Sequence, residues 1–163
     1  MKMKKFIAFF CAALMVLSLA ACGTTEDAAE TKVYNIGICQ LVQHEALDAA
    51  TAGFKQALVD EFGENVKFDE QNAAGDSNTC STIVNTFVAD EVDLIMANAT
   101  PALQAAATAT ADIPILGTSV TEYGVAMGIE NFNGTVGGNI SGTSDLAPLD
   151  QQAEMVKAWC PDA

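Results

Sequence analysis

The folded part of the chain opens with Val33-Tyr34-Asn35-Ile36-Gly37-Ile38-Cys39, a short apolar run typical of a buried strand. Apolar residues then recur at helical spacing from Leu47 to Phe62. Gly63 follows directly and favours the end of a helix. The chain therefore begins its fold with a strand that leads into a helix.

Strand and helix signals continue to alternate after this first pair. The predicted strands are residues 33–39, 66–71, 92–97 and 113–116, with a short fifth at 123–127. Strands separated by helices of this length predict β–α–β crossovers, so the fold class is α/β with a doubly wound parallel sheet. Ligands of such sheets bind at the carboxyl ends of the strands. The corresponding loops are residues 40–45, 72–77, 97–101 and 118–122.

Residues 1–21 read as an export signal rather than as part of the fold. A basic start precedes an apolar run that is short for a transmembrane helix. The run ends at Leu19-Ala20-Ala21-Cys22, which resembles the bacterial lipobox and implies lipidation of Cys22. An ordinary signal peptide with a chance cysteine is the alternative. Residues 22–32 are small, polar and acidic and predict a flexible tether.

The charge excludes several classes of partner. The formal net charge is −14 and becomes −17 once the three lysines of the predicted signal are removed, and the chain has no arginine. Phosphate binding needs a basic surface, so neither nucleic acid nor anionic lipid headgroups are expected as partners.

No cofactor, metal or enzyme active site is predicted. Cys39, Cys80 and Cys160 fit no zinc spacing and indicate buried or idle thiols, although a Cys39–Cys80 disulfide is possible in an exported protein. The chain has neither a Gly-x-Ser-x-Gly elbow nor a phosphate-binding loop. The single histidine, His44, has no nucleophile signature near it, which argues against a catalytic triad.

The last part of the chain differs in composition from the preceding repeats. Residues 131–144 are rich in glycine, asparagine, threonine and serine and predict a loop or crossing strand. Residues 149–159 predict a helix with Leu149, Ala153 and Val156 on one face. We therefore divide the chain into a signal (1–21), a tether (22–32), an α/β lobe (33–127) and a crossover segment with one helix (128–163).

Four segments resemble a family of ABC-transporter substrate-binding lipoproteins that includes tryptophan- and tyrosine-binding members. They are residues 36–48, 89–102, 115–121 and 139–145. The resemblance implies a type I periplasmic-binding fold, in which two α/β lobes close on a solute. It also implies a truncated chain that carries only the amino-terminal lobe. The expected ligand is an amino acid, with an aromatic one favoured, and the expected partner is an ABC permease. The expected location is the bacterial cell envelope, with Cys22 lipid-anchored at the outer face of the cytoplasmic membrane or in the periplasm.

The candidate ligand-binding residues lie in the loops at the predicted strand ends. They are Gln40, His44, Asp48, Asn98, Thr100, Thr118, Ser119, Ser144 and Asp145. Exposed N–H groups and the Thr100 hydroxyl at a helix start suit a carboxylate, and Asp48 could pair an ammonium group. Each residue also has a purely structural interpretation. His44 could cap the first helix, Asp48 could be solvated, and Asn98 or Thr100 could cap the third helix.

The loops after residue 117 leave the same choice open. The hydroxyls of Thr118 and Ser119 either bind polar ligand groups or form a turn. Ser144 and Asp145 either contact ligand at an interlobe hinge or belong to an N-cap for the helix near Pro148. Two other functional hypotheses remain. The chain could be a complete flavodoxin-like lipoprotein acting as sensor or scaffold, in which Leu149, Ala153 and Val156 pack on the lobe, or a non-functional fragment.

Overall fold

The computed structural model describes residues 32–161. The predicted signal, Cys22 and all of the predicted tether except Lys32 lie outside the described residues. The elements are β1 (Tyr34–Gln40), α2 (Glu45–Phe62), the short 3-10 helix η2 (Gly63–Asn65), β2 (Val66–Asn72), α3 (Ser77–Ala89), β3 (Leu94–Asn98), α4 (Thr100–Ala109), β4 (Ile115–Val120), α5 (Tyr123–Met127), β5 (Ile140–Ser144) and α6 (Leu149–Trp159).

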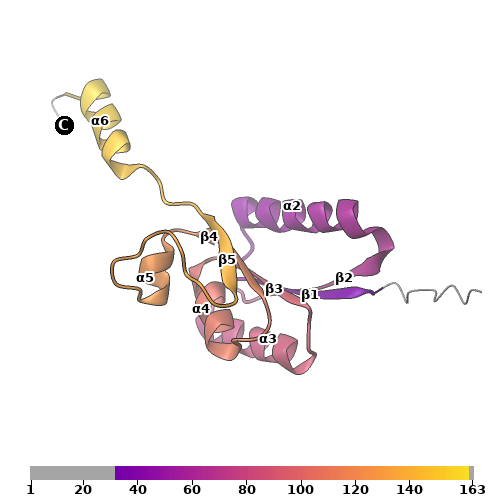
Figure 1. Cartoon of the computed structure of the whole chain (residues 1–163). Coiled ribbons are helices and arrows are strands. Elements are labelled where there is room, and N and C mark those ends of the chain that lie inside the picture. Colours follow the sequence, from indigo (N-terminus) through magenta and orange to yellow (C-terminus); the bar gives the residue numbers. More distant parts are fainter. Residues whose placement is uncertain (1–31, 162–163) are drawn as a thin grey trace, which may run out of the picture. The chain divides into compact units, whose positions relative to one another are not determined.

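The five strands form one parallel sheet in the order β2-β1-β3-β4-β5. The helix α2 covers one face of the sheet, and α3 and α4 cover the other (Figure 1). The chain thus winds outward from β1 in both directions, which confirms the predicted doubly wound α/β class. No helix among residues 32–161 is long and apolar enough to cross a membrane.

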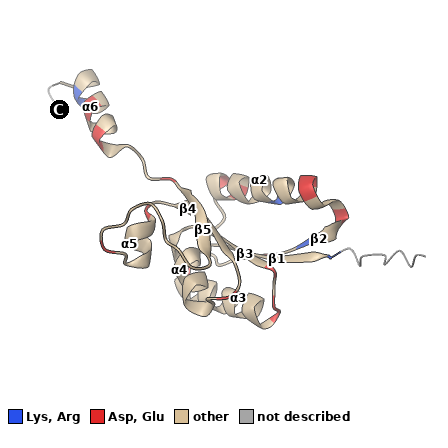
Figure 2. Cartoon of the chain, viewed as in Figure 1, with Lys and Arg blue, Asp and Glu red and all other residues tan. Residues whose placement is uncertain are grey.

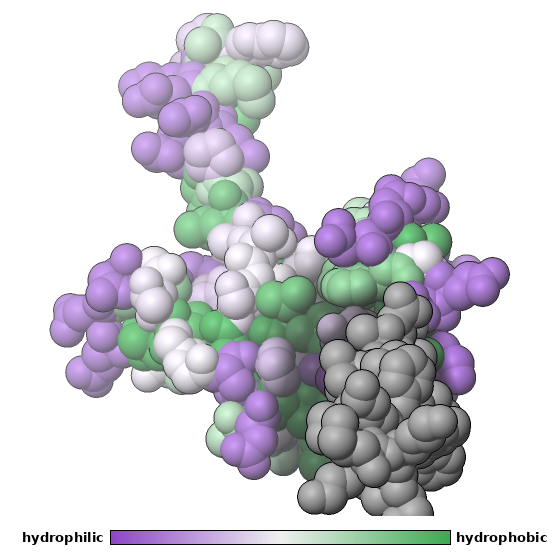
Figure 3. All heavy atoms as spheres, turned by 45° about the vertical axis from the view of Figure 1, so that its right-hand side comes forward, coloured by the Kyte–Doolittle hydropathy of each residue, from purple (hydrophilic) through white to green (hydrophobic). Residues whose placement is uncertain are grey.

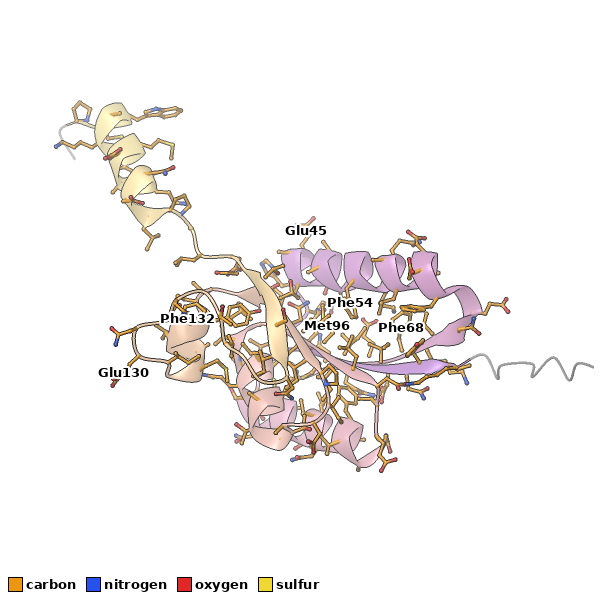
Figure 4. All side chains as sticks on the ribbon, in the orientation of Figure 1. Glu45, Phe54, Phe68, Met96, Glu130 and Phe132 are labelled. Carbon is orange, nitrogen blue, oxygen red and sulfur yellow. The ribbon has the colours of Figure 1, made fainter. Side chains whose placement is uncertain are left out.

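Two apolar layers hold the sheet between its helices. Under α2, Phe54, Leu58 and Phe62 pack against Ile36, Ile38 and Met96 of the sheet. In Figure 4, Phe54 and Met96 point toward each other between α2 and the strands. The other layer joins α3, α4 and α5 to β1, β3 and β4 through residues that include Cys39, Phe87, Ile95, Leu103 and Ile115.

The close approach of α3 to β1 depends on Gly37. A Cβ atom at this position would lie 2.6 Å from the ring of Phe87, which is fully buried. Because real Cβ contacts are longer, a side chain here would force the helix away from the strand. The glycine in the opening apolar run therefore sets the helix–strand distance on this face of the sheet.

The predicted fifth strand at residues 123–127 is wrong, because this segment is the helix α5. The carboxylate of Glu122 caps the helix by accepting hydrogen bonds from the backbone N–H groups of Gly124 and Val125. Gly128 then ends it in the left-handed conformation. The strand that completes the sheet is β5, inside the segment predicted as a loop or crossing strand.

The helix α6 agrees with the predicted helix at 149–159 but has no buried residue. Leu149 is 65% exposed and Val156 is 54% exposed. Figure 3 shows hydrophilic residues on one side of α6 and hydrophobic residues on the other. The single-domain hypothesis expects this apolar face to pack on the lobe, and it does not.

Candidate functional site

A row of polar residues crosses four neighbouring strands at the carboxyl edge of the sheet. Gln40 of β1 pairs with Asn72 of β2 on one side and with Asn98 of β3 on the other. Asn98 pairs in turn with Thr118 of β4. The row therefore brings together three of the predicted ligand-binding residues, Gln40, Asn98 and Thr118, at one level of the sheet.

Gln40 and Asn98 are joined by a hydrogen-bond network that reaches into α2. The hydroxyl of Thr51 donates to Oε1 of Gln40 at 2.7 Å and accepts from Nδ2 of Asn98 at 2.9 Å. Nδ2 of Asn98 also donates to the carbonyl oxygen of Leu47 at 2.8 Å. Gln40, Thr51 and Asn98 are buried, with 4%, 3% and 0% of their surfaces exposed. The network fastens the first half of α2 to the ends of β1 and β3.

Asn98 keeps one buried polar atom without a partner among the described residues, its side-chain oxygen Oδ1. An unpaired buried carbonyl oxygen costs free energy, so this atom has unused capacity to accept a hydrogen bond. The next residue, Ala99, has a φ of 94°, a strained value for a residue with a side chain. Such strain is concentrated at binding and catalytic sites in proteins.

The start of α4 offers backbone N–H groups at the same edge. Its N-cap is Ala99, so neither Asn98 nor Thr100 caps the helix as the structural alternative expected. Asn98 is directed to Thr51 and Leu47 instead. The N–H of Leu103 makes the first helical hydrogen bond, to the carbonyl oxygen of Ala99 at 3.1 Å. The N–H groups of Thr100 and Ala102 precede this bond. They have no acceptor inside the helix, so they can donate to an anion.

The start of α2 lies beside the buried network. His44 is the N-cap, and its Nδ1 accepts a hydrogen bond from the N–H of Ala46 at 3.2 Å. The carboxylate of Asp48 accepts from Nε2 of Gln40 at 2.6 Å. The hydrogen bond from Ala46 confirms the capping role of His44. Both His44 and Asp48 are exposed, so their outer surfaces stay open. Asp48 is therefore tied to the network rather than simply solvated.

Hydroxyl groups gather where β4 and β5 end. The hydroxyl of Thr143 donates to the hydroxyl of Thr118 at 3.4 Å, and that of Ser144 donates to the carbonyl oxygen of Thr121 at 2.9 Å. Ser119 has a φ of 53° where the pairing of β4 and β5 shifts its register. The expected N-cap role of the 143–145 segment is wrong, because the N-cap of α6 is Pro148.

Asp145 carries the negative charge in this second group. Its N–H donates to the carbonyl oxygen of Val120 at 3.0 Å, and its side chain is exposed. Burial, followed by the nearby Asp145 carboxylate, raises the pKa of Tyr123 above its ordinary value. The phenol of Tyr123 donates to the carbonyl oxygen of Thr143 at 3.3 Å, so it stays protonated and holds β5 in place.

Two open cavities flank α2. One, of about 570 Å³, lies between α2 and β2 and is lined mainly by polar and charged side chains, including Gln40, Asp48, Lys55 and Glu70. The other, of about 290 Å³, combines apolar Phe54, Met96 and Leu116 with the hydroxyl residues Thr118 and Thr143. The second cavity therefore offers apolar surface next to hydrogen-bonding groups.

The arrangement can hold a small polar molecule but shows no catalytic constellation. Among residues 32–161 no group of three His, Cys, Asp or Glu side chains lies close enough together to hold a metal ion. Acidic residues are prominent on α2 and α6 in Figure 2. Sequence reasoning missed Thr51, whose hydroxyl joins the side chains of Gln40 and Asn98. Thr51 lies mid-helix, and no local signal separates it from a solvent-facing threonine.

Known proteins resemble this chain in both sequence and fold. A tyrosine-binding protein of Clostridioides difficile (strain R20291) is 47% identical over 135 residues, which are 81% of this chain and 39% of that protein. The ligand-free, open structure of a substrate-binding protein with adhesive properties from Clostridium difficile superposes with a TM-score of 0.70 at 46% identity. An ABC domain in complex with L-Trp from Streptococcus pneumonia superposes with a TM-score of 0.73 at 34% identity.

Each of these structures covers 80% of this chain, whereas the matched part is 45% of the other chain. The chain thus spans less than half the length of these relatives. Residues 35–163 match the family described as ABC transporter substrate binding protein. This match extends over most of the chain and includes all five strands of the sheet, apart from Tyr34, the first residue of β1. The chain belongs to the ABC transporter substrate-binding protein family.

Proposed function

We propose that this chain supplies the amino-terminal lobe of a solute-binding lipoprotein that captures an amino acid, with an aromatic side chain favoured, for an ABC importer. The observation that carries the proposal is the family match over residues 35–163, together with 47% identity to a tyrosine-binding protein. A relative of known structure holds L-Trp, which belongs to the same class of aromatic amino acids.

The carboxyl edge of the sheet supports an amino-acid ligand on chemical grounds. The N–H groups at the start of α4 and the hydroxyls of Thr118 and Ser119 suit a carboxylate. The exposed carboxylates of Asp48 and Asp145 suit an ammonium group. An amino acid carries a carboxylate and an ammonium group. The edge of this lobe therefore offers hydrogen-bonding groups suited to each of them.

The rest of the binding site is proposed to come from a second lobe. The cavities at this edge are open, and a single wall cannot desolvate a ligand. Closure of two lobes would bury the ligand, and its release would deliver the solute to a membrane permease. In this proposal lipidated Cys22 anchors the protein at the outer face of the cytoplasmic membrane or in the periplasm.

The test is the melting temperature of residues 23–163 with and without L-tyrosine, L-tryptophan, L-phenylalanine, L-alanine and L-glutamate. A ligand that binds only the native state raises the melting temperature by mass action. Because this lobe supplies only one wall of the site, we expect millimolar aromatic amino acids to raise it slightly at most, and L-alanine and L-glutamate to leave it unchanged. A rise with L-glutamate alone would contradict the aromatic class and retain the importer role.

The same set of ligands is then tested on a protein in which a second lobe from a relative is fused after residue 163. A rise confined to the fused protein would support the two-lobed clamp. A cooperative melt that no amino acid shifts, in either protein, would contradict the proposed ligand class.

A further inference from the structure

Two cysteine thiols meet in the apolar layer between β1 and α3. Cys39 lies near the end of β1, and Cys80 lies in the first turn of α3. Both residues are fully buried, with 0% of their surfaces exposed. Both belong to the same cluster of buried apolar residues, the Cys80 side chain lies near enough to Cys39 to raise its pKa, and the structure has both as free thiols.

The segment between β2 and α3 holds the two cysteines in this position. The N–H of Ala73 donates to the carbonyl oxygen of Gln40 at 2.9 Å, and the N–H of Gly75 donates to that of Leu41 at 2.7 Å. Asp76 then caps α3 and accepts through its carbonyl oxygen from the N–H of Cys80 at 3.1 Å. The first turn of α3 is therefore anchored to the residues that directly follow Cys39.

We propose that Cys39 and Cys80 are a disulfide-forming pair that links β1 to α3 in the exported protein. The oxidant is a small-molecule disulfide such as oxidised glutathione. One thiolate attacks it and forms a mixed disulfide while one glutathione leaves. The second cysteine attacks the protein sulfur, which releases the second glutathione. The protein loses two electrons and two protons, and the oxidant becomes two thiols.

The disulfide forms while the chain is folding rather than after the native structure is complete. Burial raises the pKa of both thiols above the ordinary value, and the Cys80 side chain adds to the effect at Cys39. Because the thiolate is the attacking species, a folded reduced protein exchanges slowly. The bond closes before α3 has covered Cys39, and once closed it is shielded from reductant by the same burial.

The third cysteine of the described residues provides the control. Cys160 is exposed and follows α6, so it competes for oxidant without sharing the buried position. The Cys160→Ser variant removes this competition and leaves the pair intact. The Cys39→Ala and Cys80→Ala variants replace one small apolar side chain by another and each remove the bond.

The experiment unfolds residues 23–163, which lack Cys11 and Cys22, in denaturant and refolds them in reduced and oxidised glutathione, or in excess reductant. Free thiols are then alkylated, and peptides are mapped by mass spectrometry without reduction. We expect a Cys39–Cys80 peptide pair in wild type and in Cys160→Ser. We also expect the oxidised Cys160→Ser protein to melt about 10 °C higher than the reduced protein.

Each alanine variant should lose this difference in melting temperature. Oxidised Cys160→Ser that melts cooperatively and keeps both thiols alkylated would overturn the proposal, and so would predominant pairing of wild-type Cys39 or Cys80 with Cys160. The same map on protein purified without reductant and alkylated at lysis does not depend on refolding. A cross-linked pair there supports the proposal, and two alkylated thiols contradict it.

Discussion

Gln40 and Asn98 occupy partner positions at the ends of β1 and β3, and the hydroxyl of Thr51 joins their side chains from α2. Both amides are buried, so they do not present an open polar surface. Their first effect is to fix where α2 starts, and with it the exposed groups His44 and Asp48. Ligand contact by Gln40 and Asn98 themselves stays a prediction, for which Oδ1 of Asn98 is the remaining acceptor.

Replacement of Asn98 by alanine should destabilise the lobe. The substitution leaves the buried hydroxyl of Thr51 and the carbonyl oxygen of Leu47 without the Nδ2 donor. The loss of a buried hydrogen-bonding partner costs about 1–3 kcal/mol of unfolding free energy. Urea unfolding measures it, and Asn85→Ala on the exposed face of α3 is the matched control. Equal stabilities of the two variants would show that the network is not formed.

Asp76 should make α3 sensitive to acid. Its pKa lies below the ordinary value because its carboxylate accepts a hydrogen bond from the N–H of Asn78, and the Thr79 hydroxyl adds a second. A carboxylate with a lowered folded pKa stabilises the protein above its unfolded pKa and loses that contribution as the pH falls. The stabilising contribution of the cap therefore begins to fall as the pH drops below about 4, the unfolded value for an aspartate, and is lost at the lower pKa of the folded state.

The measurement compares the melting temperatures of wild type and Asp76→Asn between pH 7 and pH 2. Asparagine caps a helix without titrating in this range. We expect the wild type to lose stability relative to the variant as the pH falls through the acid range. A difference that stays constant with pH would mean that the carboxylate has the same pKa in both states.

Two glycines should respond oppositely to alanine. Gly53 lies inside α2 with open space around its Cα, so Gly53→Ala should stabilise the protein by about 0.5–1 kcal/mol through helix propensity. Gly128 ends α5 at a φ of 64°, so Gly128→Ala should destabilise it by about 1 kcal/mol. Urea unfolding of both variants measures the difference. Stabilisation by Gly128→Ala would contradict the left-handed end of α5.

Thr118 should affect ligand binding more than stability. Valine has the same shape but lacks the hydroxyl, which in the structure accepts only a long hydrogen bond from Thr143. If a ligand uses this hydroxyl, Thr118→Val should weaken binding about tenfold, the effect of one hydrogen bond of about 1.4 kcal/mol. Calorimetric titration with the bound amino acid measures it. Thr108→Val on the exposed side of α4 is the control, and equal affinities of the two variants would remove Thr118 from the site.

The sequence predicts the part of the fold that rests on apolar periodicity. The strands that begin at Tyr34 and Leu94 are buried from Ile36 and Ile95 onward on both faces of the sheet, and such runs are recognised locally. The segment 123–127 was wrongly predicted as a strand because a five-residue apolar run is too short to show a helical or strand period. Its helix depends on the cap at Glu122 and the stop at Gly128, which are stronger signals than the apolar run.

The strand β5 and the buried network could not be predicted in the same way. The strand Ile140–Ser144 is an edge strand with mostly exposed residues, so its sequence has no apolar pattern and its conformation comes from pairing with β4. The network joins Gln40, Thr51 and Asn98 across separate elements. Sequence spacing places polar residues at strand ends, but it does not tell which of them face α2 and become buried.

Leu103 in the core and Leu149 on α6 should differ in how much stability the protein loses when each is replaced by alanine. Leu103 is fully buried between α4 and the sheet, whereas Leu149 of α6 is 65% exposed. Removal of a buried leucine side chain costs about 2–5 kcal/mol, and removal of an exposed one costs less than about 0.5 kcal/mol. Urea unfolding of Leu103→Ala and Leu149→Ala measures both.

Trp159 supplies an independent reading of the same helix, because it is the only tryptophan of the chain and is 83% exposed. Its fluorescence should therefore resemble that of tryptophan in water and be quenched freely by acrylamide, an uncharged quencher. A blue-shifted, protected emission together with a cost of 2 kcal/mol or more for Leu149→Ala would show that α6 packs on another surface in solution. An exposed emission with a stable Leu149→Ala variant would leave this face available to a second lobe.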